Sequence, residues 1–285
     1  MSRSAASELP AMLDLLALMV KLRDPVSGCP WDRVQDFHSI APYTLEEAYE
    51  VVDAIGSGDP AKLREELGDL LFQVVFYAQL AQERGWFGFD AIARGIHQKL
   101  VRRHPHVFGA QPPLPGAAPE TPGEVLVAWE DLKARERGGS GVLADVPKAL
   151  PALTRAQKLG KRAGRVGFDW TDMRDVRAKI TEELAELDEA ALEAREHAPD
   201  ADGPSAHLVE EMGDLLFAIA NWGRHVGADA ESALRAANAK FERRFARMEV
   251  LARERSLVLT ALTLEQWEAL WQEAKSAERG AVREP

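Results

Sequence analysis

Carboxylate side chains recur in this sequence at spacings that could hold a hard metal cation. Glu46, Glu50 and Asp53 are four and three residues apart, which places them on one stripe of a helix. Glu66 and Asp69 follow, three residues apart, directly before an apolar run. Carboxylates entering a core need a partner, and Mg²⁺ takes carboxylate, water and phosphate oxygens. The candidate ligands for such an ion are Glu46, Glu47, Glu50, Glu66 and Asp69.

Two consecutive helices must position these side chains. Apolar residues keep a helical rhythm over residues 45–55, and Asp59 followed by Pro60 is typical of the start of a second helix. The following run, LLFQVVFYAQL, is apolar nearly all round, as in a buried helix, so Glu66 and Asp69 are expected at the rim of the core. The alternative interpretation is a solvated acidic face on which Thr44 and Glu47 form only a capping box.

The same acidic pattern occurs a second time, 136 residues after Glu46 at its start and 145 residues after Asp69 at its end. The nine-residue difference between these offsets falls in the connection between the two helices, where insertions are tolerated. The residues of the second copy are Glu182, Glu183, Glu186, Glu189, Glu211 and Asp214.

Basic and indole side chains repeat downstream in the same order. The pairs, at offsets of 141 and 142 residues, are Lys99 and Arg103 with Lys240 and Arg244, then Trp129 and Lys133 with Trp271 and Lys275. The segment Gly28–Asp32 has a looser echo in residues 167–170. Repetition over roughly 140 residues exceeds the period of solenoid repeats and indicates a duplicated domain. We therefore predict domains at 1–138 and 142–285, joined by a glycine-rich linker.

Composition favours an all-α protein. Ala, Leu, Glu and Arg dominate the 285 residues, hydrophobic residues make up 46% and charged residues 28%. The net charge of −11 argues against binding to nucleic acid or to a membrane surface, which requires basic surface. Cys29 is the only cysteine and the N-terminus has no apolar signal core, so a reducing, cytoplasmic location is expected.

Further helices are expected over eight stretches, with Thr171 and Thr263 as N-caps of two of them. These stretches are residues 8–23, 89–103, 123–137, 147–162, 172–197, 205–226, 228–255 and 264–277. The helix expected at 147–162 is basic, and it could either contact an anionic ligand or form a solvated face.

The chemistry that these residues could perform depends on metal. The sequence has no glycine-rich phosphate loop, nucleophile elbow or CxxC pair. Each copy combines an acidic cluster with two cations and an indole, which suits a polyphosphate. Mg²⁺ would neutralise phosphate oxygens and lower the pKa of a bound water, while Lys and Arg hold other oxygens and a free glutamate accepts the proton. The predicted reaction is attack on a phosphorus of a nucleoside triphosphate, with pyrophosphate leaving.

The paired motifs EExxE and ExxD resemble those of the MazG nucleotide pyrophosphohydrolases, an all-α family. The strings GCPWD, APYTLEEAYEVVDAI, ELGDLLFQVVFYAQ, RRHPHVF, VGFDW, EEMGDLLF and NAKFERRF extend this resemblance to a tandem-domain MazG over nearly the whole chain. The resemblance implies two helical-bundle domains and hydrolysis of canonical or damaged nucleoside triphosphates to the monophosphate and pyrophosphate. It also implies Mg²⁺ as cofactor, with Mn²⁺ as an alternative ion, and a homodimer.

The resemblance also assigns roles to residues. Metal ligands are Glu46, Glu47, Glu50, Glu66 and Asp69 in the first copy, and Glu182, Glu183, Glu186, Glu211 and Asp214 in the second. Glu47 and Glu183 are the candidate catalytic residues. Substrate contacts are Asn238, Lys240, Arg244, Trp271 and Lys275, with Lys99, Arg103, Trp129 and Lys133 as counterparts. Family members often carry Asn where the second copy has Asn238 and the first has His97, which favours the second copy as the main catalyst. The first copy could be active, regulatory or a dimerisation element.

Two other functions fit part of this pattern. Hydrolysis of phosphoribosyl-ATP occurs in the same superfamily, although chain length and duplication favour the first assignment. A non-catalytic helical module could instead bind a basic partner through its acidic surface, and Mg²⁺ would then leave its thermal stability unchanged.

Overall fold

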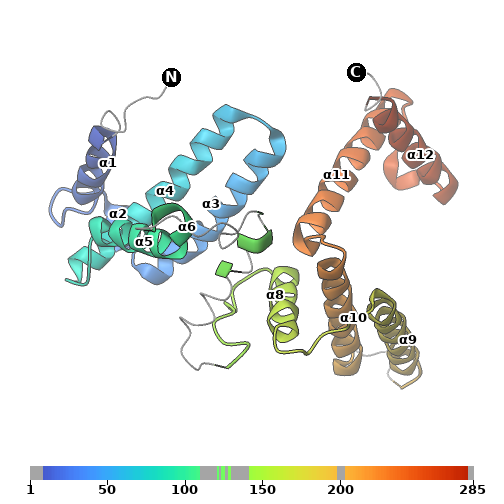
Figure 1. Cartoon of the computed structure of the whole chain (residues 1–285). Coiled ribbons are helices and arrows are strands. Elements are labelled where there is room, and N and C mark those ends of the chain that lie inside the picture. The colour runs from blue at the N-terminus through green and yellow to red at the C-terminus, as the bar shows by residue number, and fades with distance from the viewer. Residues whose placement is uncertain are drawn as a thin grey trace. The chain divides into compact units, whose positions relative to one another are not determined.

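Helices form every regular element in the described part of the chain, so the prediction of an all-α fold is confirmed (Figure 1). The computed structural model describes residues 9–109, 121, 123–125, 128–129, 141–197 and 203–281. The chain divides into two compact units, Met1–Gly138 and Gly139–Pro285. Their identity as domains related by duplication stays a prediction that rests on the repeated motifs. No helix in these ranges is long and apolar enough to cross a membrane.

The first unit is built on the antiparallel pair of helices α3 and α4, with α1 and α5 packed against α4 (Figure 1). Its helices are α1 (Leu9–Leu22), α2 (Pro30–Val34), α3 (Phe37–Ser57), α4 (Pro60–Glu83), α5 (Phe89–Arg103) and α6 (Pro105–Phe108). Gly58 lies in the left-handed region at φ +70° and ends α3, and the Asp59 side chain accepts a hydrogen bond of 2.8 Å from the backbone N–H of Ala61. The predicted cap at Asp59 is therefore confirmed, and this turn folds α4 back along α3.

Helix α3 begins seven residues before Thr44, which corrects the capping-box interpretation. Asp36 is the N-cap, and its side chain accepts from the backbone N–H groups of His38 and Ser39. Thr44 therefore lies inside the helix, where its Oγ1 is 2.7 Å from the Tyr77 Oη on α4. The threonine joins the two helices that carry the carboxylates and does not start one of them.

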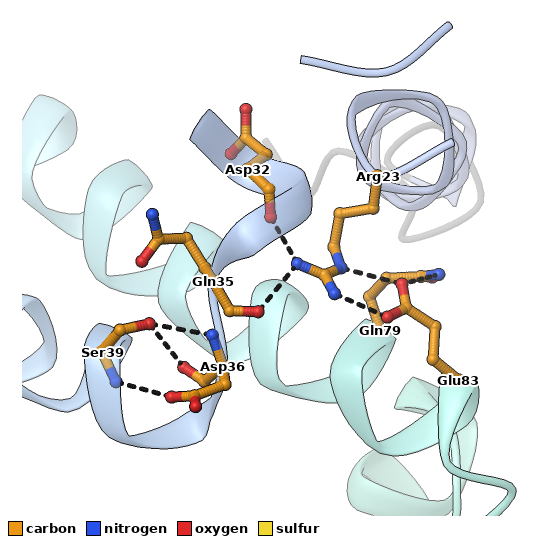
Figure 2. A network of polar contacts seen from close by, with 7 residues as sticks. All are labelled: Arg23, Asp32, Gln35, Asp36, Ser39, Gln79 and Glu83. Atoms are coloured by element: carbon orange, nitrogen blue, oxygen red, sulfur yellow. Dashed lines mark hydrogen bonds and ion pairs between the residues drawn. The ribbon is translucent and has the colours of Figure 1, made fainter. Parts of the chain in front are cut away.

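An arginine joins the ends of three helices in the first unit (Figure 2). Arg23, just after α1, donates hydrogen bonds of 2.8 and 2.7 Å to the Glu83 carboxylate at the end of α4. Its remaining terminal nitrogen donates to the backbone carbonyls of Asp32, inside α2, and of Gln35, just after α2. Beside it lies an apolar core of Met19, Ile40, Val75, Phe76 and Leu80.

The second unit is built on the helix pair α9 and α10, with α8 packed against α10 (Figure 1). Its helices are α8 (Ala152–Gly164), α9 (Met173–His197), α10 (Ala206–His225), α11 (Ala230–Glu254), the short 3-10 helix η2 (Leu259–Ala261) and α12 (Leu264–Ala281). Helices α11 and α12 form a second pair with its own core of Met248, Leu251, Ala252, Leu270 and Ala274.

Two predicted helix starts in this unit need correction, and one cap is confirmed. Helix α8 starts after Pro151 and not at residue 147, because proline restricts the residue before it to extended backbone. Asp172, not Thr171, caps α9, since its Oδ1 accepts a bond of 2.8 Å from the backbone N–H of Arg174. Thr263 caps α12 as predicted, with its Oγ1 3.3 Å from the backbone nitrogen of Gln266.

Candidate metal and substrate site

The hairpin of the first unit brings three carboxylates into one cluster. Glu47 comes from α3, and Glu66 and Asp69 come from α4; one oxygen of each lies within 4.8 Å of the others. Residues 66 and 69 share a face of α4 because they are three positions apart. Glu46 and Glu50, the other predicted ligands, lie outside this group of three.

The carboxylates of this first cluster destabilise each other's charged forms. Burial raises the pKa of Glu47 above its usual value, and the charge of Asp69 adds to this increase. The pKa of Glu66 is raised by desolvation, by the charge of Glu50 and by a hydrogen bond with the Glu50 side chain. Glu50 therefore lies against the cluster even though it is not one of the three closest groups. A bound cation would relieve this repulsion.

The second hairpin repeats the arrangement with equivalent residues. Oxygens of Glu183 on α9 and of Glu211 and Asp214 on α10 lie within 4.8 Å of one another. Glu183 is only 5% exposed, so its charge sits at the edge of the core. Desolvation and the charge of Glu183 raise the pKa of Glu186, which lies on the same helix. Glu182 is outside the group of three.

A lysine that the sequence reasoning missed contacts the second cluster. The Lys179 Nζ lies 2.9 Å from Glu182 and 2.7 Å from Glu183. Hydrogen bonds that Lys179 donates to these two carboxylates raise its pKa, with Glu183 the larger cause, so the lysine stays charged. Its spacing of three and four residues before the glutamates could have revealed it. At the repeat offset of 136, the first unit has Tyr43 in this place.

A histidine occupies a second position where the two copies differ. His207 Nε2 lies 3.2 Å from an oxygen of Glu211, and its Nδ1 lies 3.4 Å from Glu193. At the offset of 145 the first unit has Lys62, whose charge lowers the pKa of Glu66. Each cluster thus has a basic neighbour on its second helix, a lysine in the first unit and a histidine in the second.

The predicted substrate residues of the second unit form a separate group on α11 and α12. The Arg244 guanidinium lies 5.6 Å from the centroid of the Trp271 ring and 2.7 Å from Glu278. Asn238 and Lys240 are exposed on α11, and Lys275 is partly buried on α12. In the described ranges, no ion pair or hydrogen bond joins Lys240 or Arg244 to the carboxylates of α9 and α10.

The counterparts in the first unit are only partly described. Lys99 and Arg103 lie near the end of α5, the helix that also carries His97. The Trp129 ring lies edge-on to His104, with ring centroids 4.7 Å apart. Lys133 lies outside the described residues.

Both clusters have the chemistry required for Mg²⁺. They offer oxygen atoms only, from three carboxylates on two helices, and hard cations prefer such ligands. The pKa values of Glu47 and Glu66 are raised first by desolvation and then by neighbouring carboxylate charges, and a divalent ion would offset both effects. The best-supported ligands are Glu47, Glu66 and Asp69, and Glu183, Glu211 and Asp214.

Fold and site together define an all-α protein that carries a carboxylate cluster on each of two helical hairpins. Residues 35–108 match the MazG nucleotide pyrophosphohydrolase domain. A nucleoside triphosphate pyrophosphohydrolase of Escherichia coli K12 is 52% identical over 267 residues, which cover 93% of this chain and 97% of that protein. The nucleoside triphosphate pyrophosphohydrolase/pyrophosphatase MazG of Thermotoga maritima is 43% identical over 93% of this chain and 96% of its own length. The chain belongs to the MazG nucleotide pyrophosphohydrolase family, as the sequence motifs indicated.

Proposed function

We propose that this protein is a metal-dependent hydrolase that converts nucleoside triphosphates to nucleoside monophosphates and pyrophosphate. The observation that carries the proposal is the convergence of three carboxylates within 4.8 Å on each hairpin, in a chain 52% identical to a nucleoside triphosphate pyrophosphohydrolase. Because the protein has a net charge of −11, a bare polyphosphate would be repelled, and cations at these clusters would reverse the local charge.

The groups of three carboxylates are the proposed ligands for Mg²⁺. When bound, this ion neutralises phosphate oxygens and lowers the pKa of a coordinated water. Glu182, Glu186, Glu46 and Glu50 surround the same clusters and would orient water or a further ion.

A side chain of the protein must also accept the proton of the attacking water. In the reaction, a water oxygen bonds to phosphorus, the bond to the bridging oxygen of the leaving pyrophosphate breaks, and the water proton goes to a base. Glu183 is the proposed acceptor in the second unit and Glu47 in the first, each through the carboxylate oxygen that is not a metal ligand. The ion pair of 2.7 Å from Lys179 restricts the Glu183 side chain, and a general base must be held in position.

Phosphate oxygens are proposed to contact Lys240, Arg244 and Lys275, with Asn238 and Trp271 completing the substrate contacts. Arg244 is held by Glu278 at 2.7 Å, so it is already positioned but must share its hydrogen bonds when phosphate binds. The pKa of Glu278 is lowered by Arg244 and Arg243, which keeps this pair charged at neutral pH.

We place the main activity in the second unit. Its cluster contains the most buried carboxylate, Glu183 at 5% exposed, and has Lys179 beside it. Asn238 is also present there, where the first unit has His97.

A homodimer is the proposed assembly. Leu67, Leu71 and Val74 form an exposed apolar stripe on α4, and their equivalents Met212, Leu216 and Ile219 are exposed on α10. A helical hairpin that leaves one apolar face uncovered is typically completed by another helical pair.

Matched substitutions in the two clusters test the proposed function. Glu183→Gln and Asp214→Asn should each reduce turnover about 100-fold or more, because removing one charge-stabilising group from an active site typically costs that much. Glu47→Gln and Asp69→Asn, which are the same changes in the first unit, should reduce it much less. Turnover is measured by chromatography of the monophosphate together with pyrophosphate release, and circular dichroism checks the fold. Failure of the unmodified protein to form either product from any nucleoside triphosphate with Mg²⁺ would contradict the proposal.

A further inference from the structure

A cavity lies next to the second carboxylate cluster. Its volume is about 240 Å³, and it lies between α8, the segment before α9, and α10. Its lining is mainly apolar and includes the aromatic rings of Phe168, Trp170 and Phe217. Asp169, Asn221 and Arg224 supply its polar side chains.

A smaller cavity at the carboxylates shares lining residues with this one. The smaller cavity, of about 70 Å³, is lined by Lys179, Glu183 and Asp214 among others. Trp170, Phe217 and Asn221 line both cavities. If the phosphates of a ligand lie at the carboxylate cluster, the part of the ligand attached to them can lie against Trp170, Phe217 and Asn221.

The Asn221 side chain lies where the two cavities meet, and one of its two polar atoms is available to a ligand. Asn221 is 3% exposed, and its Oδ1 accepts a hydrogen bond of 2.9 Å from Arg224 Nε. Because an arginine nitrogen can only donate, this bond fixes the amide orientation and leaves Nδ2 as the free donor. In the described part of the chain, Nδ2 makes no hydrogen bond. Asn221 Nδ2 is not one of the fully buried polar atoms without a partner, so it is accessible at the cavity wall and can donate to a ligand there.

The surroundings hold this amide in place. A Cβ at residue 160 would lie 2.7 Å from Asn221 Oδ1, so the glycine there allows the amide to lie against α8. Arg224 is held in turn by Asp169, whose Oδ1 lies 2.6 Å from an Arg224 terminal nitrogen and 3.0 Å from His225 Nε2. Asp169 has a lowered pKa, chiefly because of the Arg224 hydrogen bond, so it is charged and neutralises the arginine. The polar side of the cavity is therefore a hydrogen-bonding site and has no unpaired positive charge to bind phosphate.

We propose that this cavity receives the nucleobase of the substrate, with Asn221 Nδ2 donating to a carbonyl oxygen or ring nitrogen of the base and Trp170 stacking against its ring. The inference depends on the proposed function, because it takes the phosphates to lie at Glu183 and Asp214. Flat aromatic bases stack on aromatic side chains and are read by hydrogen bonds to their edges. This assignment places the base on the α8 side of α10, whereas the family resemblance places base contact at Trp271.

The first unit has no equivalent of this site. At the repeat offset of 145 residues, Phe217 corresponds to Phe72, but Asn221 corresponds to Phe76. Phe76 is 0% exposed and belongs to the apolar core of the first unit. A core phenylalanine thus replaces the hydrogen-bond donor, so base recognition by this contact belongs to the second unit alone.

The substitution Asn221→Asp tests the inference with the least change of shape. It keeps the oxygen that accepts from Arg224 and replaces the free donor by an acceptor. We expect KM for nucleoside triphosphates to rise about three- to tenfold, the effect of losing one buried hydrogen bond, with kcat little changed. Inorganic tripolyphosphate, which has no base, should inhibit the variant and the unmodified protein with the same inhibition constant. Gln266→Glu, the same chemical change at the N-terminus of α12, is the control and should alter neither value.

A second variant keeps the test informative if Asn221→Asp is poorly folded. Trp170→Leu should raise KM for nucleotides roughly tenfold through lost stacking, again without changing inhibition by tripolyphosphate. If a variant raises KM for nucleotides and the inhibition constant of tripolyphosphate by the same factor, or changes neither value, the nucleobase site is overturned. If the unmodified protein hydrolyses no nucleotide, the proposed function fails first, and the two failures are thereby distinguished.

Discussion

Desolvation of the clustered carboxylates, together with their mutual repulsion, links the stability of the fold to pH and to metal. The pKa values of Glu47, Glu66 and Glu186 are raised in the folded protein above the ordinary glutamate value of 4.5. A raised pKa contributes stability that is complete below the unfolded value and is lost as pH rises through the folded value. Without metal, these groups therefore favour unfolding at neutral pH. A cation that binds their charged forms should reverse this effect.

We predict that Mg²⁺ raises the melting temperature near pH 7.5 and raises it much less near pH 5, where protons compete for the same oxygens. The measurement is a thermal melt at each pH with and without saturating Mg²⁺. Taking the difference between the two conditions removes the contribution of groups remote from the clusters, such as Glu83 and Asp169. The double variant Glu47→Gln with Glu183→Gln should lose most of the Mg²⁺ effect. If Mg²⁺ does not change the melting temperature, or changes it more at the lower pH, the result favours the non-catalytic interaction module.

Spacing in the sequence could identify the candidate ligands but not which of them meet. Spacing gives five candidate ligands on two helices in each copy, yet only three of the five in each copy form the group whose oxygens lie within 4.8 Å of one another. The crossing of two helices selects among them, and crossing geometry depends on packing contacts such as Thr44 with Tyr77 that the acidic pattern does not contain. Lys179 was readable from its spacing of four residues before Glu183 on one helix, whereas Asn221 was not. The importance of Asn221 comes from the cavity that it lines.

At the level of elements, Arg23 holds α1, α2 and α4 together (Figure 2). Its side chain is 8% exposed and pairs with Glu83 while donating to two backbone carbonyls. The Glu83 pKa is lowered, chiefly by the Arg23 hydrogen bond, so the stabilisation is present above the ordinary glutamate pKa and is lost as pH falls.

We predict that Arg23→Leu destabilises the protein by roughly 2–4 kcal/mol, because Glu83 loses its charged partner and keeps only Gln79 as a donor, and two backbone carbonyls lose the arginine. Arg94→Leu is the control. Arg94 pairs with Asp90 at 2.6 Å, but both side chains are more than 70% exposed. Its loss should cost about 0.5 kcal/mol or less, as for other exposed helical ion pairs. Urea unfolding followed by tryptophan fluorescence measures both variants, and equal losses would contradict the role given to Arg23.

The start of a helix was predicted correctly where an N-cap residue directly precedes an apolar helical pattern. Other helix starts were predicted at the wrong residue. Asp59 and Thr263 cap α4 and α12 as expected, since each directly precedes a helical pattern. Helix α3 extends back to Asp36 because its upstream residues also pack into the core, and Ile40 is buried there. Such tertiary contacts extend a helix beyond the first cap signal that the sequence offers.

For the whole molecule, composition and the internal repeat were sufficient to predict an all-α chain. The helix-favouring residues and the long repeat indicate helical units of roughly 140 residues each. The patterning alone does not reveal which apolar faces stay uncovered. Periodicity shows that a face is apolar, but Leu67 on α4 and Val75 on the same helix look alike in sequence, and only Val75 is buried.

The uncovered stripes lead to a prediction about assembly. Leu71 and Leu216 occupy equivalent positions on α4 and α10, and both are exposed in the single chain. Covering these stripes by a second copy would bury apolar area from both units, which is the dominant favourable contribution to association. We therefore expect the protein to run at twice the chain mass of 31.4 kDa in light scattering coupled to size exclusion.

Leu216→Glu should shift the protein toward the monomer mass, because a charge in the centre of an apolar interface cannot be paired there. Leu264→Glu provides the matched control, since Leu264 is 85% exposed at the start of α12, where an acidic side chain favours the helix. If the two variants and the unmodified protein all have the chain mass at every concentration, the stripes are not a dimer interface.

If Leu216→Glu becomes monomeric and also loses turnover while circular dichroism is unchanged, assembly and the site on α9 and α10 depend on each other. That dependence is expected, because the stripe on α10 lies on the same helix as Glu211 and Asp214, and association would fix the position of that helix.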